Sequence, residues 1–194
     1  MILKNAKFVL SAPNKNSWID DDISEIVLLG RSNVGKSTLI NAITGNNKIA
    51  KVSSTPGRTR LLNFFDINNS EFRLVDAPGY GYAGVSKKND KNFAVMMSEY
   101  LSLRSNLKGA LFLLDSRRTP NSDDVVIYNN LVNNNIPIIM IATKYDKLNQ
   151  SERATLKRKI SLAFGISEEI ELIKSSNLET IWIEKVISKI YELI

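Results

Sequence analysis

The chain of 194 residues contains no cysteine and no histidine. The absence of cysteine excludes disulfide scaffolds, cysteine nucleophiles and zinc sites built from thiolates. The absence of histidine excludes Ser-His-Asp hydrolases, histidine general bases and histidine-ligated metals. Any metal must therefore be bound through oxygen atoms, which favours Mg²⁺ or a similar hard cation.

Long hydrophobic runs are also lacking. The longest apolar stretches, such as Ile136–Ala142, are too short to span a bilayer. The N-terminus shows no long apolar segment with a small-residue cleavage site, so we expect no secretory signal, no membrane partner and a cytoplasmic protein. Hydrophobic residues make up 43% and charged residues 24% of the chain, which is typical of one folded domain rather than a disordered chain.

The charge balance is moderately basic. Lysine and arginine number 26 against 20 aspartate and glutamate residues, which gives a net charge of +6. Such an excess is compatible with a nucleic-acid partner, but many other proteins carry it, so charge alone does not decide the partner.

Short apolar segments alternate with amphipathic ones along the chain. The expected strands cover Glu25–Leu29, Leu61–Ile67, Glu71–Val75, Ala110–Asp115, Pro137–Thr143 and Ile170–Ile173. The expected helices cover Lys36–Ile43, Asn92–Arg104, Ser122–Asn134 with Ser122 as its cap, Ser151–Phe164 and Glu179–Leu193. This order predicts an α/β fold with a mainly parallel six-stranded sheet, one antiparallel strand and helices on both faces. Ligands in such folds bind at the carboxyl ends of the strands.

Residues 30–37 read GRSNVGKS and match the phosphate-loop pattern GxxxxGK[ST] between an expected strand and an expected helix. Glycines let consecutive backbone N–H groups point at an anion, and the helix N-terminus adds its positive dipole end. Lys36 would neutralise the β- and γ-phosphates and Ser37 would offer a hydroxyl to Mg²⁺. A glycine-rich turn without a ligand is the alternative. The residues assigned to this phosphate site are Gly30, Arg31, Ser32, Asn33, Val34, Gly35, Lys36, Ser37 and Thr38.

A second motif, DAPG at Asp76, Ala77, Pro78 and Gly79, follows the expected strand that ends at Val75. Asp76 would hold Mg²⁺ directly or through water, and Gly79 would present its backbone N–H to a γ-phosphate. By itself DxxG is most often an ordinary turn, so its position after the phosphate loop carries the prediction.

A third motif, TKYD at Thr143, Lys144, Tyr145 and Asp146, follows the apolar strand that begins at Pro137. A carboxylate at Asp146 can accept hydrogen bonds from guanine N1–H and the 2-amino group, whereas adenine would leave it unpaired. The stem of Lys144 can lie over the purine face, and Thr143 can support the loop. The alternative is a solvated Lys-Asp turn, which the two preceding motifs disfavour.

Two polar loops complete the predicted site. The segment from Ser53 to Arg60 could order around γ-phosphate and Mg²⁺ as a switch, with Thr59 as the preferred metal ligand; a flexible polar loop is the alternative. The residues assigned to nucleotide binding there are Gly57, Arg58, Thr59, Arg60 and Leu61. Ser175, Ser176 and Asn177 follow the last expected strand and could contact the guanine edge, or could equally form a helix N-cap.

Taken together, the strings GRSNVGKST, GRT, DAPGYGYA, TKYD and SSN resemble a P-loop GTPase, and more narrowly the EngB family (also called YihA or YsxC) of bacterial and organellar GTPases. The segment Asp115-Ser116-Arg117 also resembles a DxR segment of that family. The SSN loop departs from the pattern, because Thr180 and Ile181 stand where a glycine often follows.

The resemblance implies a G domain of the P-loop NTPase fold over residues 23–194, preceded by a lead-in of residues 1–22 packed on it. It implies a monomer that binds GTP and GDP with Mg²⁺. It also implies a nucleotide-dependent switch in assembly of the large ribosomal subunit, needed for normal cell division and septation.

The residue after DxxG is Tyr80, where a glutamine would orient the attacking water. We therefore expect slow intrinsic hydrolysis, with Lys36, Thr59 and Gly79 as the catalytic residues, acting through positioning and charge neutralisation. The alternative is a nucleotide-dependent RNA-binding scaffold with negligible turnover, and an ATP-using enzyme is a further rival that TKYD disfavours.

Two hypotheses concern further partners. In GTPases that this loop resembles, an asparagine at the position of Asn33 helps to hold K⁺ beside the phosphates; an ordinary loop asparagine is the alternative. Basic residues near the expected switch loops could bind ribosomal RNA phosphates, although they could equally be solvated loop residues. They are Arg58, Arg60, Lys87, Lys88, Lys91, Arg117 and Arg118.

Overall fold

The computed structural model describes residues 3, 5–46, 48–50, 61–81, 87–176 and 178–194, with 87–91 described only as helical backbone. The predicted residues Gly57, Arg58, Thr59, Arg60 and Asn177 lie outside the described residues, as do the side chains of Lys87, Lys88 and Lys91. Within the described part, no helix combines the length and the apolar character needed to cross a bilayer.

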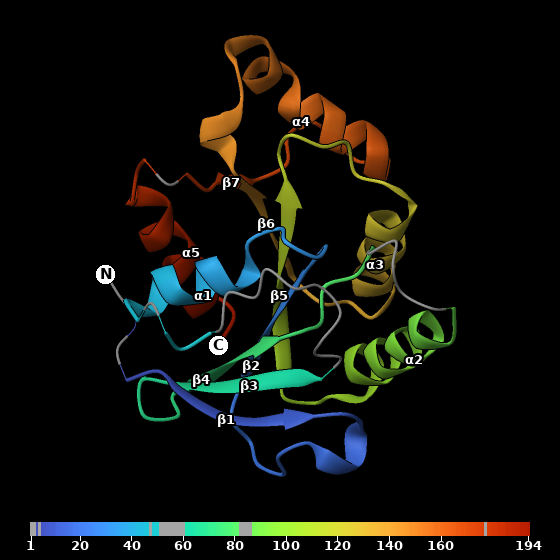
Figure 1. Ribbon diagram of the computed structural model, residues 1–194, viewed down its shortest axis with the longest axis vertical. Coiled ribbons are helices and arrows are strands. Elements are labelled where there is room, and N and C mark those ends of the chain that lie inside the picture. The colour runs from blue at the N-terminus through green and yellow to red at the C-terminus, as the bar shows by residue number, and fades with distance from the viewer. Residues whose placement is uncertain (1–2, 4, 47, 51–60, 82–86, 177) are drawn as a thin grey trace.

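The described strands form one sheet of seven, in the order β1-β3-β4-β2-β5-β6-β7 (Figure 1). The strands are β1 (Lys7–Ala12), β2 (Glu25–Gly30), β3 (Leu62–Ile67), β4 (Phe72–Asp76), β5 (Leu107–Asp115), β6 (Ile138–Thr143) and β7 (Leu172–Lys174). Only β3 runs against its neighbours β1 and β4, and the other described pairs are parallel. The predicted fold class is confirmed, but the predicted count of six strands is wrong. The seventh strand is β1, whose apolar run covers only residues 8–10 and is too short to predict a strand.

Helices cover both faces of this sheet, as Figure 1 shows. They are α1 (Lys36–Thr44), α2 (Lys87–Leu103), α3 (Ser122–Asn133), α4 (Gln150–Phe164) and α5 (Ile181–Tyr191), with short 3₁₀ turns at Lys15–Ser17 and Tyr145–Lys147. One buried cluster joins α1 and α5 to one face, and a second joins α2, α3 and α4 to the other. The sheet is therefore the middle of three layers.

Strand β2 shows why the sequence pattern selects this arrangement. All six of its residues are buried. Val27 and Leu29 lie in the cluster with α2, α3 and α4, whereas Ile26 and Leu28 lie in the cluster with α1 and α5. A strand buried on both faces needs an unbroken apolar run, and each such side chain contributes about 1.5–3 kcal/mol on burial.

Two helices begin one residue or more before their predicted starts. The cap of α3 is Asn121, whose side chain accepts the Asp124 N–H while the Asp124 carboxylate accepts the Asn121 N–H, so Ser122 is the first helical residue and not the cap. In the same way Asn149 and Glu152 close a capping box at α4, which begins at Gln150 rather than Ser151. Neighbouring residues with similar capping chemistry made these starts ambiguous in the sequence.

Other boundaries differ by a few residues. Helix α2 begins five residues before the predicted Asn92, and α5 is shorter than the predicted Glu179–Leu193. The last strand, β7, lies at Leu172–Lys174 rather than Ile170–Ile173. The hairpin is confirmed, because Asn68, Asn69 and Ser70 have φ of 51°, 59° and 69° between β3 and β4.

Buried charged side chains form hydrogen bonds at the end of the sheet opposite the carboxyl ends of its parallel strands. Glu25, at the start of β2, is fully buried and accepts hydrogen bonds from Tyr100 Oη (2.8 Å) and Arg104 Nε (3.0 Å). Arg73 of β4 donates to both carboxylate oxygens of Asp21, at 2.8 and 2.7 Å, and from Nε to Asp66. These contacts tie the segment before β2 to the sheet.

Candidate functional site

The motif loops meet at the carboxyl edge of the parallel strands. The phosphate loop follows β2, the DAPG motif begins at the end of β4, and TKYD begins at the end of β6. Parallel pairing sets Leu28 beside Asp76, and Asp115 beside Thr143. Segments far apart in sequence therefore converge where an α/β fold binds ligands.

The phosphate loop is shaped by residues that tolerate unusual backbone conformations. Gly35 has φ of 116° and caps α1 without any side-chain hydrogen bond, and Asn33 has φ of 61°. A Cβ on Gly30 would lie 2.8 Å from the Leu113 carbonyl oxygen, so only glycine fits beside β5. Because Gly35 contributes no side-chain cap, the first N–H groups of α1 remain suited to an anion.

The DAPG motif lies directly against the phosphate loop. A Cβ on Gly79 would be 2.7 Å from the Ser32 Cα, and the Ser32 N–H donates to the Tyr80 carbonyl oxygen at 2.9 Å. Arg31 and Tyr80 form an isolated parallel bridge. Gly79 and Ser32, which are each assigned to the nucleotide site from the sequence, therefore lie in contact.

Tyr80 points away from that contact and into the core. Its hydroxyl donates to Asp124 Oδ1 at 2.8 Å, in the capping box of α3. Burial and the neighbouring Asp124 charge raise the pKa of Tyr80 far above its usual range, so the phenol remains a donor. The sequence identifies Tyr80 only as the residue that follows DxxG, and it gives no sign that its side chain contacts α3.

Lys36 and Asp76 form a buried, loosely spaced ion pair. The Lys36 Nζ lies 3.9 Å from Asp76 Oδ1, and the two side chains are 10% and 15% exposed. Burial lowers the pKa of Lys36 and raises the pKa of Asp76, and their mutual attraction opposes both shifts only in part. Among the described residues, Asp76 Oδ1 has no hydrogen-bond partner.

The Lys36–Asp76 pair is suited to binding a metal cation together with phosphate groups. Mg²⁺ prefers carboxylate and hydroxyl oxygens and usually takes only one or two protein ligands beside substrate phosphates. A buried carboxylate oxygen that lacks a hydrogen bond, on Asp76, meets that requirement, and Ser37 stands at the second position of α1. No group of three or more acidic residues suited to a metal occurs in the described ranges, so the phosphates would supply the remaining ligands.

The TKYD loop is bonded to the phosphate loop. Thr143 Oγ1 donates to the Val34 carbonyl oxygen at 2.8 Å, and Lys144 Nζ donates to the Asn33 carbonyl oxygen at 2.8 Å. The Asp146 side chain is 2% exposed and lies 3.1 Å from Lys147 Nζ. The predicted phosphate and base loops therefore form one unit.

The loop after β7 lies beside TKYD, but its serines are used for local structure. The Ser175 backbone carbonyl oxygen accepts the Tyr145 N–H at 3.0 Å, and the Ser175 backbone N–H donates to the Ala142 carbonyl oxygen at 2.8 Å. Ser176 accepts the Leu178 N–H on its hydroxyl and the Trp182 indole N–H on its carbonyl. The cap of α5 is Thr180, so the alternative of an SSN cap for that helix is wrong.

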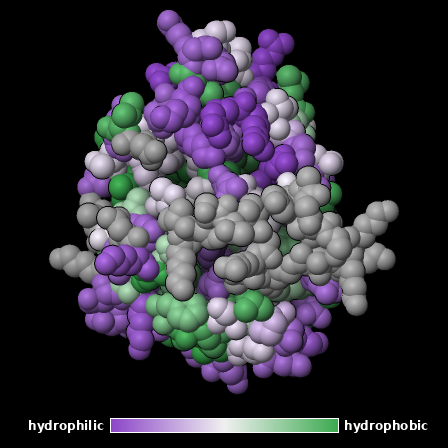
Figure 2. All heavy atoms as spheres, viewed as in Figure 1, coloured by the Kyte–Doolittle hydropathy of each residue, from purple (hydrophilic) through white to green (hydrophobic). Residues whose placement is uncertain are grey.

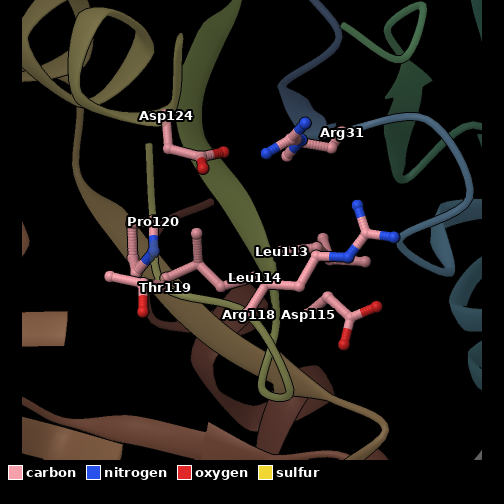
Figure 3. Close-up of a pocket in the computed structure, with 8 residues that line it drawn as sticks. All are labelled: Arg31, Leu113, Leu114, Asp115, Arg118, Thr119, Pro120 and Asp124. Atoms are coloured by element: carbon pink, nitrogen blue, oxygen red, sulfur yellow. The ribbon is translucent and has the colours of Figure 1, made fainter. Parts of the chain in front are cut away.

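Other predicted positions flank these loops. Leu61 is half-buried just before β3, Thr38 is exposed on α1, and Ala77 is buried beside Pro78. A hollow beside the phosphate loop is lined by Arg31, Leu113, Leu114, Asp115, Arg118, Thr119, Pro120 and Asp124. Figure 3 shows Arg31 and Asp124 facing each other across it.

Comparisons with known proteins agree with this geometry. A family model described as "50S ribosome-binding GTPase" matches residues 25–144. A "Probable GTP-binding protein EngB" of Mycoplasma capricolum subsp. capricolum is 52% identical over 193 residues, covering 100% of this chain and 96% of the relative.

Solved structures share the fold. A crystal structure of a probable GTP-binding protein EngB matches with a TM-score of 0.70 at 24% identity, covering 88% of this chain and 98% of the other. Era, solved in complex with MgGDPNP and nucleotides of 16S ribosomal RNA, matches with a TM-score of 0.64 at 24% identity, covering 89% of this chain and 57% of Era. With the matched family model and the extent of the sequence identity, these findings show that the chain belongs to the EngB family of GTP-binding proteins and contains a P-loop GTPase domain.

Proposed function

We propose that the carboxyl edge of the sheet binds GTP and GDP, with phosphates at residues 30–38 and guanine at Asp146. The observation that carries this is the bonding of Thr143 and Lys144 to carbonyls of the phosphate loop. It makes one rigid unit of two loops that would hold opposite ends of one nucleotide. The Asp146 carboxylate, 2% exposed and 3.1 Å from Lys147 Nζ, can accept hydrogen bonds from the N1–H and 2-amino groups of guanine, which adenine lacks.

The metal would be Mg²⁺, held by Ser37 and Asp76 together with Thr59, which lies outside the described residues. When bound, Mg²⁺ neutralises charge that develops on the β- and γ-phosphates. The buried Lys36 ammonium would act on the same phosphates, and the Gly79 N–H would orient the terminal one. Burial lowers the pKa of Lys36 and raises that of Asp76. A phosphate beside Lys36 and a cation beside Asp76 would each oppose these shifts by favouring the charged form.

Intrinsic hydrolysis would be slow. The Tyr80 hydroxyl is engaged by Asp124, and its raised pKa makes it a poor general base for an attacking water. The same observation favours the second candidate, a nucleotide-dependent RNA-binding scaffold with negligible turnover. Phosphate release measured without a partner and again with ribosomes separates the two: a fast rate without any partner contradicts slow turnover.

K⁺ is a further candidate ion. Asn33 lies at an exposed, left-handed position of the phosphate loop, and its carbonyl oxygen accepts from Lys144. If Asn33 helps to hold K⁺, hydrolysis in KCl exceeds that in NaCl; equal rates would remove K⁺ from the mechanism.

The cellular role would be a cytoplasmic, monomeric switch in assembly of the large ribosomal subunit, and through it in cell division and septation. The description of the matched family model supports a large-subunit partner. The Era neighbour was solved with 16S ribosomal RNA, which is a small-subunit RNA, and supports RNA binding in general. Of the basic residues considered, Arg117 and Arg118 are exposed beside the proposed nucleotide site, and hydrophilic side chains predominate over α4 (Figure 2). Binding to large subunits that does not weaken with salt would argue against RNA phosphate contacts.

The domain would span residues 23–194, with residues 1–22 as a packed lead-in. The pairing of β1 with β3 and the contact of Asp21 with Arg73 support this division. Strand β1 lies along β3 as far as the level of Asp76, whereas Asp21 contacts Arg73 at the opposite end of β4.

Calorimetric titration of GDP and ADP against the wild type and Asp146→Ala tests the proposal. We expect wild type to bind GDP and to reject ADP, and Asp146→Ala to lose most of that discrimination because the carboxylate that reads the base is gone. Glu168→Ala, an exposed carboxylate after α4, is the control for loss of one negative charge. Equal binding of ADP and GDP by the wild type would refute guanine recognition.

A further inference from the structure

Asp115 is the last residue of β5 and lies between the phosphate loop and the TKYD loop. It pairs in register with Thr143 of β6, and its side chain is 9% exposed. In the sequence this residue stands only within a DxR string that indicates no role for it. Its position at the carboxyl edge brings its carboxylate to the proposed base-binding side of the site.

The Asp115 carboxylate and the phosphate loop hold the same ammonium group. Lys144 Nζ lies 2.9 Å from Asp115 Oδ2 and donates to the Asn33 carbonyl oxygen at 2.8 Å. The backbone of Lys144 is in the left-handed region, with φ of 59°. The lysine is therefore fixed at its backbone and at its tip, so its aliphatic stem has little freedom between them.

Arg117 fixes the other side of the carboxylate. Its Nε and Nη2 donate to the two Asp115 oxygens at 2.9 and 2.8 Å, and its backbone N–H donates at 3.2 Å. Burial raises the pKa of Asp115, but the hydrogen bonds from Arg117 and Lys144 outweigh it and hold that pKa well below its usual range. The carboxylate is thus ionised at neutral pH and oriented before any ligand arrives.

We propose that Asp115 is a positioning residue that holds the Lys144 stem in place for stacking on the purine. The inference rests on the proposed guanine site and deepens it. A free lysine has many rotamers to lose on binding, whereas a lysine already fixed at both ends loses few. Asp115 acts through Lys144 and touches no part of the nucleotide itself.

A double-mutant cycle on GDP affinity tests this, using Asp115→Ala, Lys144→Ala and the double variant. We expect Asp115→Ala to weaken GDP binding about tenfold, as expected for loss of one charge-assisted hydrogen bond. In the Lys144→Ala background the same change should have no further effect, because the residue that it positions is absent. Independent, additive losses in the two backgrounds would overturn the proposal, as would unchanged affinity in Asp115→Ala.

A second measurement, the affinity for inosine diphosphate, distinguishes loss of Lys144 positioning from movement of the Asp146 loop. Inosine diphosphate lacks the 2-amino group that Asp146 would read, whereas the purine face offered to Lys144 is retained. Asp115→Ala should therefore weaken GDP and inosine diphosphate by the same factor. A changed ratio would mean that the Asp146 loop has moved, and the positioning role would then be wrong.

The controls keep folding and the proposed function separate from this inference. Asp123→Ala removes an exposed carboxylate on α3 and changes the net charge equally, so it should leave GDP affinity unchanged. If Asp115→Ala does not fold, Asp115→Asn replaces it in the same cycle; because its acceptor oxygen can still bind Lys144, the expected loss is smaller, but it must again vanish in the Lys144→Ala background. If the wild type fails to bind GDP, the proposed function fails; if it binds and the cycle is additive, only the role of Asp115 fails.

Discussion

At the scale of single residues, Glu25 has the most demanding environment, because its side chain is fully buried. Arg104 and Tyr100 supply its charge and hydrogen-bond partners. A buried ion pair adds little net stability, but removal of one partner leaves an uncompensated charge. The apolar pattern of β2 gave no hint of this network, because its partners are about 80 residues away in sequence.

Arg104→Ala should therefore lower the free energy of unfolding by about 3–5 kcal/mol. Urea denaturation at neutral pH measures this. The double variant Glu25→Gln/Arg104→Met, which removes both charges, should lose less than the single variant. If the double variant loses as much or more, the penalty does not come from the orphaned carboxylate.

Gly79 is constrained at the same scale by its closeness to the phosphate loop. A Cβ there would lie 2.7 Å from Ser32 Cα and 2.9 Å from its nitrogen, so an alanine must displace backbone. We expect Gly79→Ala to reduce GTP hydrolysis by at least about tenfold, as for other lost transition-state contacts, because the N–H meant for the terminal phosphate moves.

GDP lacks that phosphate, so the affinity of Gly79→Ala for GDP should change much less than its rate. Single-turnover phosphate release and calorimetric GDP titration separate the two quantities. An equal loss in both would show that the substitution deforms the phosphate loop instead of displacing Gly79.

At the scale of secondary-structure elements, the capping residues of α3 and α4 differ from those that the sequence favours. Serine at 122 or 151 satisfies the usual preference for a cap, yet Asn121 and Asn149 hold that position in α3 and α4. Which of two adjacent capping residues is used depends on where the preceding loop enters the helix, and that is decided by packing.

Asn121→Ala and Asn149→Ala should each destabilise the protein by about 0.5–2 kcal/mol, because each removes the acceptor for an N3 backbone N–H. Ser122→Ala and Ser151→Ala, at the first turns of the same helices, should have smaller effects. Thermal or urea unfolding of the four variants compares them directly. Larger losses in the serine variants would instead identify Ser122 and Ser151 as the capping residues.

At the scale of the whole molecule, acid stability depends on carboxylates that join distant segments. Hydrogen bonds from Arg73 lower the pKa of Asp21 below its ordinary value of 3.8, with burial opposing them. A carboxyl whose pKa is lowered on folding stabilises the fold above its unfolded pKa and loses that contribution as pH falls through its folded pKa. Asp76 has the opposite sign, because burial raises its pKa and protonation favours the folded state.

The free energy of unfolding should therefore fall as pH decreases below about 4, and Asp21→Asn should show a shallower decrease. Urea unfolding at pH 5 and pH 3 measures the difference. Asp20→Asn, the exposed neighbour, is the matched control. Equal slopes for Asp21→Asn and the wild type would mean that the Asp21–Arg73 contact contributes nothing to acid stability.

The sequence alone determined the order of the helices and of six of the seven described strands, the α/β class and the strings that indicate phosphate, metal and guanine recognition. These features are local: a buried strand needs an apolar run, and a phosphate loop needs glycines and a lysine at fixed spacing. For the same reason the predicted phosphate, DAPG and TKYD loops were found without any structure. Their individual ligand roles remain predictions.

Only the tertiary structure decided which side chains meet across the fold. It added β1 to the sheet, buried Tyr80 against Asp124, and placed Asp115 on the ammonium of Lys144. Each of these contacts joins residues separated by more than 25 positions. Local periodicity carries no information about such pairs, because they exist only once the sheet has brought the strand ends together.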